Sequence, residues 1–501
     1  MATFHPPSSL QELIGVVERE ARESRREAYV VGGTVRDVLL ARETRDLDVA
    51  VDREALAFAR TLADALDGSF VELDEAHAIA RVVLRDGRYV DVAEMRGGLE
   101  ADLRRRDFTL DAMAVRAGRA EVIDLVGGLR DLDGRIVRMT SAAAFDDDPL
   151  RLLRAVRIVS ELGFTIEQET ARAIRQRASK VNEAARERRR DELARMFELE
   201  DAYGAMRSLD ALGLLDQTLP ELAEGRGVSQ PPEFHVYDVF EHNMRTLEAM
   251  DVMLAPSQPS YERAWLREEL WDVFGDDARR QYDAYLDAQP VEGRSRRGLL
   301  KLSALLHDAG KPRTRTVDAS GRIRFFGHAD EGARIAASIM RRLRYAGREE
   351  RFVTLLVQEH LRPVQLAQKG EAPTRRALYR FYRDLGEAAP AVLLLALADG
   401  AASAGWRLTR TGWRRQVAYM AGLLVRSQEE EGIVRPPRLL TGRDIMRELG
   451  VPEGPHIGRW LEALREAQAA GEVTDSESAL AHVRTLAAQE HLQERQGVER
   501  G

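Results

Sequence analysis

Hydrophobic and polar residues follow one another along the first part of the chain in a pattern that predicts both helices and strands. Residues 9–27 and 54–66 space their apolar side chains as amphipathic helices do. Short β-prone runs predict strands at residues 29–31, 46–51, 69–73, 78–85 and 88–93. Asp86-Gly87 is typical of a tight hairpin between the last two runs. We therefore predict a small mixed sheet with helices on one face.

One stretch of this region combines a glycine turn with two aspartates. Gly32 and Gly33 interrupt an apolar run, and glycines let a backbone approach a phosphate closely. Thr34 is placed to cap the helix that follows. Alternation along a strand puts Asp46 and Asp48 on one face, where their carboxylates repel unless a cation lies between them. The pattern favours Mg²⁺ bound with a triphosphate over the alternative of two solvated aspartates beside a tight turn.

The composition is that of a globular protein. The chain has 501 residues, of which 44% are hydrophobic and 32% charged. It has no cysteine, which excludes disulfides and thiolate metal sites. We found no run long enough to span a membrane and no signal pattern at the N-terminus, so we expect a cytoplasmic protein.

The charge of the chain does not exclude a nucleic-acid partner. The net charge of −8 argues weakly against one, but phosphate is bound by local patches. Arginine-rich patches lie at residues 104–106, 186–190 and 294–297. Only four lysines occur, so nearly all the positive charge is arginine, which suits bidentate phosphate binding.

The glycine turn and the aspartates carry a family resemblance. GG-x-VRD followed by D-x-D resembles the head domain of the class II (bacterial-type) tRNA nucleotidyltransferase and poly(A) polymerase family. The resemblance implies that Asp46 and Asp48 are catalytic and hold Mg²⁺. It also implies nucleotide-binding roles for Gly32, Gly33, Arg36 and Asp37.

Residues 103–115, LRRRDFTLDAMAV, resemble the second motif of this family, RRDFT-x-N-A. The match implies that Arg105, Arg106 and Asp107 bind the nucleotide, with arginines compensating phosphate charge. Asp111 stands where the family usually has Asn, so a sugar or phosphate contact there is not expected to carry over. Asp91, on the last predicted strand, is either a third carboxylate near the pair or an exposed strand residue. The turn DLVGGLRDL, residues 124–132, is interpreted as structural.

Residues 146–164 predict a helix in which Asp148 and Arg151 fall within one turn. On pattern alone they form a helix cap and an intrahelical ion pair. The resemblance to the family's E-D-x-x-R motif, with Asp147 in place of Glu, implies instead that they read the Watson–Crick edge of the incoming base. Arg154, one turn further on, is included among the nucleotide-binding residues. In residues 187–197, Glu187, Arg188 and Glu192 match the E-R-x-x-x-E motif and are expected to form helix-stabilising ion pairs.

A second constellation follows the helical middle of the chain. Four histidines and two aspartates lie near the ends of apolar helices in an order that resembles the HD superfamily of metal-dependent phosphohydrolases. Imidazole and carboxylate groups suit a divalent metal that activates water to attack a phosphate. Lys311 is expected to contact phosphate. The implied metal ligands are His242, His307, Asp308, His328, His360 and Asp399.

The patterns predict an α+β fold class. The resemblance implies its parts: a small mixed-sheet, polymerase-β-like nucleotidyltransferase head, followed by an all-helical neck and body, an HD domain and C-terminal helices. A stretch with proline and glycine, residues 225–232, marks one boundary. The aromatic side chains of Tyr261, Trp265, Trp271 and Phe274 are interpreted as packing rather than as a base-stacking platform. The predicted domains are 1–138 (head), 139–226 (neck and body with the nucleotide-selecting helix), 233–402 (HD domain), 403–488 (C-terminal helices) and 489–501 (disordered tail).

The resemblance implies a template-independent enzyme that adds nucleotides to the 3′ end of tRNA. Full CCA-adding members usually carry a long flexible loop after the strand of Asp91, whereas this chain has only VAEMRGGLEAD there, as CC-adding members do. We therefore predict addition of C residues from CTP. Full CCA addition, A addition from ATP and poly(A) synthesis are alternatives, as is an HD phosphohydrolase acting on RNA ends or nucleotides as the main activity.

Overall fold

The chain forms two compact units. The structure, a computed structural model, describes residues 2–44, 46–75, 77–256, 263–367, 373–429 and 436–498. One unit consists of Met1–Leu199 and Gly204–Thr218, and the other of Glu200–Tyr203 and Leu219–Gly501. Each unit has its own hydrophobic core and is described by itself.

The first unit contains a mixed sheet of seven strands in the order β3-β4-β5-β2-β1-β6-β7. Strands β2 and β5 pair in parallel, and the other pairs in the sheet are antiparallel. The predicted mixed sheet is confirmed. It contains two more strands, β6 and β7, which the hydrophobic pattern did not predict. The strands are β1 Ala28–Val31, β2 Asp46–Val51, β3 Ser69–Asp74, β4 Ile79–Val83, β5 Tyr89–Glu94, β6 Met113–Arg116 and β7 Val122–Asp124.

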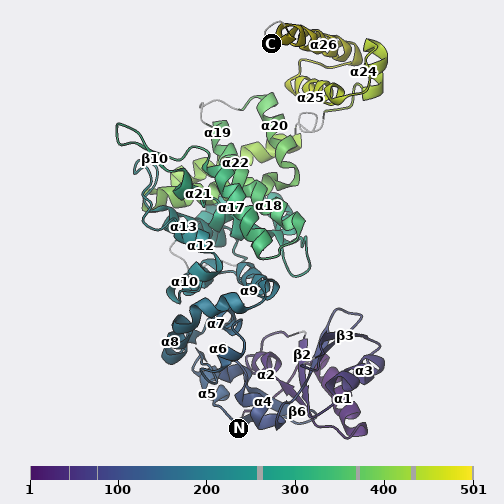
Figure 1. The fold of residues 1–501 in the computed structure, drawn as a ribbon, viewed down its shortest axis with the longest axis vertical. Coiled ribbons are helices and arrows are strands. Elements are labelled where there is room, and N and C mark those ends of the chain that lie inside the picture. The colour runs from purple at the N-terminus through teal and green to yellow at the C-terminus, as the bar shows by residue number, and fades with distance from the viewer. Residues whose placement is uncertain are drawn as a thin grey trace. The chain divides into compact units, whose positions relative to one another are not determined.

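Helices α1 (Ser8–Glu23) and α3 (Ala55–Ala65) pack on the sheet (Figure 1). Helix α1 buries the apolar side that its spacing predicts. The short helix α2 (Gly33–Leu39) begins after Gly32, whose φ of +67° favours glycine. Thr34 does not cap this helix, contrary to the prediction. Its hydroxyl accepts a hydrogen bond from Asp48 N at 2.9 Å and donates to Asp46 O at 3.2 Å, which fixes α2 against β2.

The rest of the first unit is mainly helical, with one short parallel pair of strands, β8 and β9. Gly128, in the turn predicted to be structural, lies so close to the backbone of Thr109 that a Cβ would come within 2.3 Å of Thr109 O. The carboxylate of Asp124 accepts hydrogen bonds from four backbone N–H groups of this turn. The elements are α4 Gly98–Arg104, η1 Thr109–Asp111, α5 Gly128–Asp133, β8 Ile136–Val137, α6 Ala144–Asp147, α7 Arg151–Leu162, β9 Thr165–Ile166, α8 Gln168–Arg177, η2 Ala178–Glu183, α9 Arg186–Glu198, α10 Ala202–Ala211 and α11 Leu215–Thr218.

The second unit is a helical body around a large apolar core. Trp271 is buried in this core and stacks edge-on against Phe274 and Tyr282, so these aromatics pack as expected, while Tyr261 lies outside the described residues. The elements are α12 Pro220–Ala223, α13 Val239–Leu254, α14 Trp265–Asp287, α15 Arg296–Leu306, α16 Lys311–Thr314, β10 Thr316–Val317, β11 Ile323–Arg324, α17 His328–Arg342, α18 Gly347–Glu359, α19 Arg362–Ala367, α20 Arg375–Leu385, η3 Gly386–Ala388, α21 Ala389–Ala404, η4 Gly405–Arg407 and α22 Arg410–Glu429.

One described segment, Arg375–Arg407, is long and apolar enough by composition to cross a membrane, contrary to the prediction that no such run exists. Of its most apolar window, 72% is buried inside the protein. The segment contains α21, whose side chains form the centre of the core. It is therefore explained as the core helix of a folded body.

The C-terminal helices α24 (Gly442–Leu449), α25 (Pro455–Ala470) and α26 (Ser476–Val498) share a small core of their own. The predicted disordered tail, residues 489–501, is wrong for residues 489–498, because α26 continues to Val498. Glu490 accepts hydrogen bonds from the Trp460 indole and from Arg459, which holds this part of the helix to α25. Residues 499–501 lie outside the described residues.

Candidate active site and metal centre

A cavity of about 580 Å³ lies in the first unit between the sheet and helices α2 and α7. It gathers residues from motifs that are far apart in the sequence. Arg105 is the one predicted nucleotide-binding residue that does not line it; its side chain is half-exposed and paired with Asp102. The predicted residues that line the cavity are Gly32, Gly33, Arg36, Asp37, Asp46, Asp48, Arg106, Asp107, Asp148, Arg151 and Arg154.

Three carboxylates face this cavity from neighbouring parallel strands. Asp46 and Asp48 lie on one face of β2, and Asp91 is the register partner of Asp48 on β5. Asp91 therefore joins the pair, but it also forms a bidentate ion pair with Arg81, with N–O distances of 2.8 and 2.9 Å. Burial and the nearby carboxylate of Asp91 raise the pKa of Asp48 to about 6.

The surroundings of Asp48 fit a divalent cation. A Cβ at Gly32 would lie 3.0 Å from Arg106 Nη1 and 3.4 Å from Asp48 Oδ2, so only glycine leaves this space open. Burial raises the pKa of Asp46 as well. Carboxylates that are crowded and desolvated in this way are stabilised in their charged form by a hard cation, for which oxygen donors are the preferred ligands.

The arginines of the cavity are held in place by buried acids. Arg36 Nη1 lies 2.7 Å from Asp111 Oδ1, and Arg36 also bonds Asp37. Asp111 is therefore the buried partner of Arg36. Arg154 is paired with Asp107 at 3.0 Å. This arrangement presents several guanidinium groups to a single anion.

Asp148 does not lie within the helix, contrary to the prediction. It has extended backbone angles between α6 and α7, and α7 begins at Arg151. Asp148 pairs with Arg188 of α9, with N–O distances of 3.2 and 2.8 Å. Arg151 Nη1 donates to the carbonyls of Arg105 and Ala144, each at 3.1 Å. Both side chains line the cavity with internal partners already in place.

Arg188 and Glu192 of the E-R-x-x-x-E motif connect α9 to other segments. Arg188 reaches Asp148, and Glu192 pairs with Arg157 of α7 at 2.7 Å. The expectation of helix-internal ion pairs was therefore wrong for these two residues. Their bonds join α9 to the segment that carries Asp148.

Other cavity residues were not found from the sequence: Thr44, Arg81, Tyr89, Arg157 and Arg195. Tyr89 donates a hydrogen bond to Asp46, and Arg81 faces Asp91 across the β4–β5 pair. Period-two alternation from Asp91 along β5 places Tyr89 on the same face, and this was the available signal.

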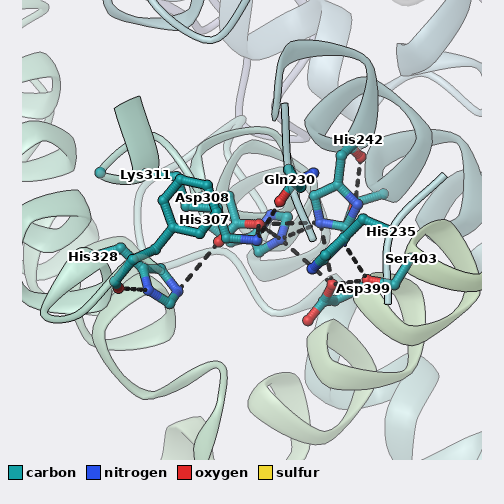
Figure 2. Close-up of polar contacts among 12 residues, drawn as sticks. Gln230, His235, His242, His307, Asp308, Lys311, His328, Asp399 and Ser403 are labelled. Atoms are coloured by element: carbon teal, nitrogen blue, oxygen red, sulfur yellow. Dashed lines mark hydrogen bonds and ion pairs between the residues drawn. The ribbon is translucent and has the colours of Figure 1, made fainter. Parts of the chain in front are cut away.

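The second unit brings the predicted histidines and aspartates together (Figure 2). His242 Nε2 lies 3.1 Å from His307 Nε2, 3.1 Å from Asp308 Oδ2 and 3.2 Å from Asp399 Oδ1. His328 Nε2 and His360 Nε2 lie 3.4 and 3.7 Å from Asp308 Oδ1. Side chains from five helices or helix ends thus converge on one buried point.

This cluster has the orientation expected of metal ligands. The Nδ1 atoms of His307, His328 and His360 bond the carbonyl oxygen three residues earlier, at 2.9, 2.7 and 2.7 Å. An Nδ1–H that donates to a carbonyl leaves the Nε2 lone pair free to face the centre. Among the described residues, His328 Nε2, His360 Nε2 and Asp308 Oδ1 are buried without a hydrogen-bond partner. The donor set therefore fits one or two divalent ions.

Two further residues qualify the sequence prediction for this centre. Lys311 Nζ lies 2.5 Å from Asp308 Oδ2 and 2.7 Å from Gln230 Oε1, so it is buried against a predicted ligand rather than open to phosphate. His235 was not predicted. It stacks edge-on to His242 with ring centroids 5.0 Å apart, and its Nδ1 lies 3.1 Å from Ser403 Oγ.

A carboxylate pair on a small mixed sheet, joined in one chain to a histidine–aspartate cluster on helices, defines a nucleotidyltransferase that carries an HD domain. Residues 28–99 and 86–138 match the poly A polymerase head domain, residues 163–225 the probable RNA and SrmB-binding site of polymerase A, and residues 278–402 the HD domain.

Full-length relatives narrow this class. An A-adding tRNA nucleotidyltransferase of Deinococcus radiodurans is 38% identical over 92% of this chain and 95% of its own length. A CC-adding tRNA nucleotidyltransferase of Thermus thermophilus is 35% identical over 91% of this chain and 93% of its own length. The chain belongs to the family of bacterial CCA-, CC- and A-adding tRNA nucleotidyltransferases.

The fold agrees with solved structures. The Thermotoga maritima CCA-adding enzyme complexed with tRNA superposes with a TM-score of 0.58 and 20% sequence identity over 96% of both chains. At this identity the likeness concerns the fold alone.

Proposed function

We propose that this enzyme adds C residues from CTP to the 3′ end of tRNA, building the CC of the CCA end. The observation that carries the proposal is the placement of Asp46 and Asp48 opposite guanidinium groups in one cavity. A cavity with oxygen donors on one side and cations on the other suits a metal-bound triphosphate.

The residues of the cavity then have distinct roles. Asp46 and Asp48 hold Mg²⁺, which when bound compensates the phosphate charge and orients the reacting oxygens. Gly32, Gly33 and Arg36 cradle the triphosphate together with Arg106 and Arg154. The 3′-oxygen of the tRNA forms a bond to the α-phosphorus and loses its proton, and the bond from that phosphorus to the bridging oxygen breaks, so that pyrophosphate leaves.

Asp148 and Arg151 read the base. A carboxylate accepts a hydrogen bond from the exocyclic amine of cytosine, and a guanidinium donates to its ring nitrogen or carbonyl. Adenine also carries an amine, so this pair alone does not select between C and A.

The choice of C rests on the short connection after β5. Strand β5 ends at Glu94 and α4 begins at Gly98, so only three residues, 95–97, join them. The relative from Thermus thermophilus is CC-adding. A addition is the second candidate, favoured by the higher identity, 38% against 35%, to the A-adding enzyme of Deinococcus radiodurans.

A nucleotide addition assay separates these candidates. Radiolabelled CTP or ATP is supplied with a tRNA transcript that lacks its CCA end and with one that ends in CC. The proposal expects two C residues on the first transcript and no AMP on the second. Robust AMP incorporation on the transcript ending in CC would establish A addition in its place.

We also propose that the HD centre is a second, metal-dependent phosphohydrolase site. Its carrying observation is the set of Nε2 atoms turned toward Asp308 and Asp399. Phosphomonoesterase and phosphodiesterase assays with Mg²⁺, Mn²⁺, Co²⁺ and Ni²⁺ test this, with the His307→Ala and Asp308→Ala double variant as the negative control.

The proposed functional parts are head 1–138, neck and body 139–226, HD domain 233–402 and C-terminal helices from residue 403, of which the last, α26, continues to Val498. The substrates are tRNA and CTP, and the cysteine-free composition suits a cytoplasmic site of action.

A further inference from the structure

Asp48 faces the side of the first cavity on which the triphosphate is proposed to lie. A Cβ at Gly32 would lie 3.0 Å from Arg106 Nη1 and 3.4 Å from Asp48 Oδ2, so these two groups border one small space. The charges of Arg106 and Arg154 oppose the rise that burial causes in the pKa of Asp48. This side of the cavity therefore holds arginines that suit a triphosphate.

Asp46 faces a different set of groups in the same cavity. Burial raises the pKa of Asp46, while a hydrogen bond from Tyr89 and the charges of Arg81 and Arg195 act against this rise. Tyr89, Arg81 and Arg195 all line the cavity. Arg81 Cζ lies 3.8 Å from the centre of the Tyr89 ring. The cavity therefore has two cationic sides, one beside each aspartate.

Arg195 differs from the other arginines of this cavity. The described lining contains seven arginines. Six of them bond an acid or a backbone carbonyl: Arg36, Arg81, Arg106, Arg151, Arg154 and Arg157. Arg195 is exposed, and it forms no hydrogen bond or ion pair with any residue that the structure describes. Its guanidinium group therefore keeps its donors for a ligand.

The position of Arg195 on α9 turns it toward the cavity. Arg188, Glu192 and Arg195 are spaced four and three residues apart, so they share one face of the helix. Arg188 pairs with Asp148, which lines the cavity. Glu192 pairs with Arg157, another lining residue. These two bonds hold this face of α9 against the cavity wall.

The chemistry of nucleotidyl transfer distinguishes the two sides. The attacking 3′-oxygen and the leaving pyrophosphate lie roughly in line across the α-phosphorus. With the pyrophosphate among the arginines beside Asp48, the acceptor RNA enters on the side of Asp46. The nucleotide that supplies the attacking oxygen also carries a phosphodiester on its 5′ side. One negative charge therefore arrives on the side where Arg195 lies.

We propose that Arg195 binds the last phosphodiester of the acceptor tRNA, the one that joins its two terminal nucleotides. A guanidinium group without an internal partner can donate two parallel hydrogen bonds to such a phosphate. Arg81 is not available in this way, because its Nε and Nη2 atoms both bond Asp91. The inference rests on the proposed triphosphate site and holds for addition of either C or A.

The first experiment removes the charge of that phosphodiester. A tRNA without its CCA end is made with a neutral methylphosphonate as its last linkage and a 2′-O-methyl group on the preceding ribose, and the reference tRNA carries the 2′-O-methyl group alone. For the wild type, the neutral linkage should lower kcat/KM for tRNA about tenfold or more, as expected for one lost contact between charged groups. Arg195→Ala should lower kcat/KM for the reference tRNA by the same factor and lose no more with the neutral linkage. KM for CTP should stay within about twofold of the wild type, because the triphosphate contacts are kept.

Three controls locate the contact. Arg195→Lys keeps the positive charge and should stay within about threefold of the wild-type kcat/KM. Arg60→Ala, at an exposed position of α3 outside the cavity, should behave as the wild type. A neutral linkage one nucleotide further from the end should cost Arg195→Ala as much as it costs the wild type. If the losses from Arg195→Ala and from the neutral last linkage multiplied, or if the variant raised KM for CTP instead, the proposal would be overturned.

A binding measurement separates this contact from the choice of nucleotide. Fluorescence anisotropy without CTP gives the dissociation constants of the same tRNAs. The neutral last linkage should weaken binding to the wild type by about the factor seen in kcat/KM and leave binding to Arg195→Ala unchanged. This result would support the contact even where AMP is added in place of CMP, an outcome that overturns the choice of C alone. Equal weakening of both proteins by the neutral linkage would exclude Arg195 as its partner.

Discussion

Asp48 lies at the centre of the first cavity and shows how several neighbours act on one side chain. Thr34 holds its backbone, Gly32 leaves room beside it, and Asp91 repels its charge. The carboxylate is thus crowded with like charge, and a bound cation would stabilise its charged form. A substitution that removes the charge of Asp48 but keeps its shape should therefore affect catalysis more than folding.

We predict that Asp48→Asn lowers CTP incorporation into tRNA by about a thousandfold or more, because the neutral amide is a poor ligand for Mg²⁺ and leaves the phosphate charge uncompensated. The measurement is the initial rate at saturating CTP, with circular dichroism to verify folding. Asp67→Asn, on an exposed turn, should retain the wild-type rate. Wild-type activity of Asp48→Asn would remove Asp48 from the catalytic pair.

Asp107 is expected to make the stability of the first unit depend on pH. Burial alone would raise its pKa, but Arg154 and Arg151 hold the pKa of this carboxyl below its usual value. A lowered folded-state pKa stabilises the protein above the unfolded value of about 3.9, and this contribution is lost as the pH falls through the folded value. The first unit should therefore lose stability below about pH 4.

The variant Asp107→Asn should be less stable than wild type at pH 7 by roughly 1–3 kcal/mol, since Arg154 loses its partner. Between pH 5 and pH 3, the free energy of unfolding of this variant should change less than that of the wild type, because the variant lacks the titrating carboxyl. Thermal unfolding followed at several pH values measures both effects. If the melting temperatures of the two proteins fell in parallel with pH, Asp107 would not be the group that makes the stability depend on acid.

At the scale of elements, short connections and close glycine contacts position the sites. In the first unit, three residues join β5 to α4, and Gly128 packs against the backbone of Thr109. In the second unit, Gly405 ends α21 with a positive φ and admits Val236. At both glycines a neighbouring segment packs against the Cα atom, and a Cβ atom would push that segment away.

We predict that Gly405→Ala destabilises the second unit by about 1–3 kcal/mol, because alanine is strained at this φ and its methyl group collides with Val236. Gly422→Ala is the matched control on α22: no neighbouring atom lies within 4 Å of its Cβ position, so helix propensity should stabilise it by roughly 0.5–1 kcal/mol. The melting temperatures of the two variants should move in opposite directions. Equal shifts would exclude close packing as the cause.

Features of the sites that depend on residues close together in the sequence could be predicted. The alternation around Asp46 and Asp48 predicted their strand and shared face, and the resemblance of the histidine and aspartate order to the HD superfamily implied a cluster. Residue pairs brought together by strand register or helix packing were not predictable. Arg81 meets Asp91 through the β4–β5 register, and Arg188 reaches Asp148 from forty positions away.

The strands β6 and β7 were missed because each is short, with four and three residues. β6 also follows shortly after the charged RRDFT segment. His235 was missed because it lies in a segment without regular periodicity before α13. Its place beside His242 and Ser403 depends on how helices α13 and α21 pack.

At the scale of the whole molecule, the two proposed metal centres lie in separate compact units. Each cluster takes all its proposed ligands from its own unit. The two activities should therefore be separable by mutation and by metal addition.

We predict that Mn²⁺ or Co²⁺ stabilises the second unit by about 2.7 kcal/mol at a hundred times the dissociation constant, since the ion binds the folded cluster. Differential scanning calorimetry with and without the ion measures the shift. The double variant His307→Ala, Asp308→Ala should show no shift yet keep wild-type CTP incorporation. Loss of nucleotide addition in that variant would show that the centres are coupled.

The pairing of Asp148 with Arg188 has a consequence for the range of nucleotide concentrations over which the enzyme works. Arg188 takes up two acceptor sites of the carboxylate, so a base that bonds Asp148 would use the remaining lone pairs or displace Arg188. The apparent affinity for a base that uses Asp148 is lowered by the fraction of molecules in which the pair is closed. If the base displaces Arg188, a stronger internal pair would raise the nucleotide concentration at which addition saturates.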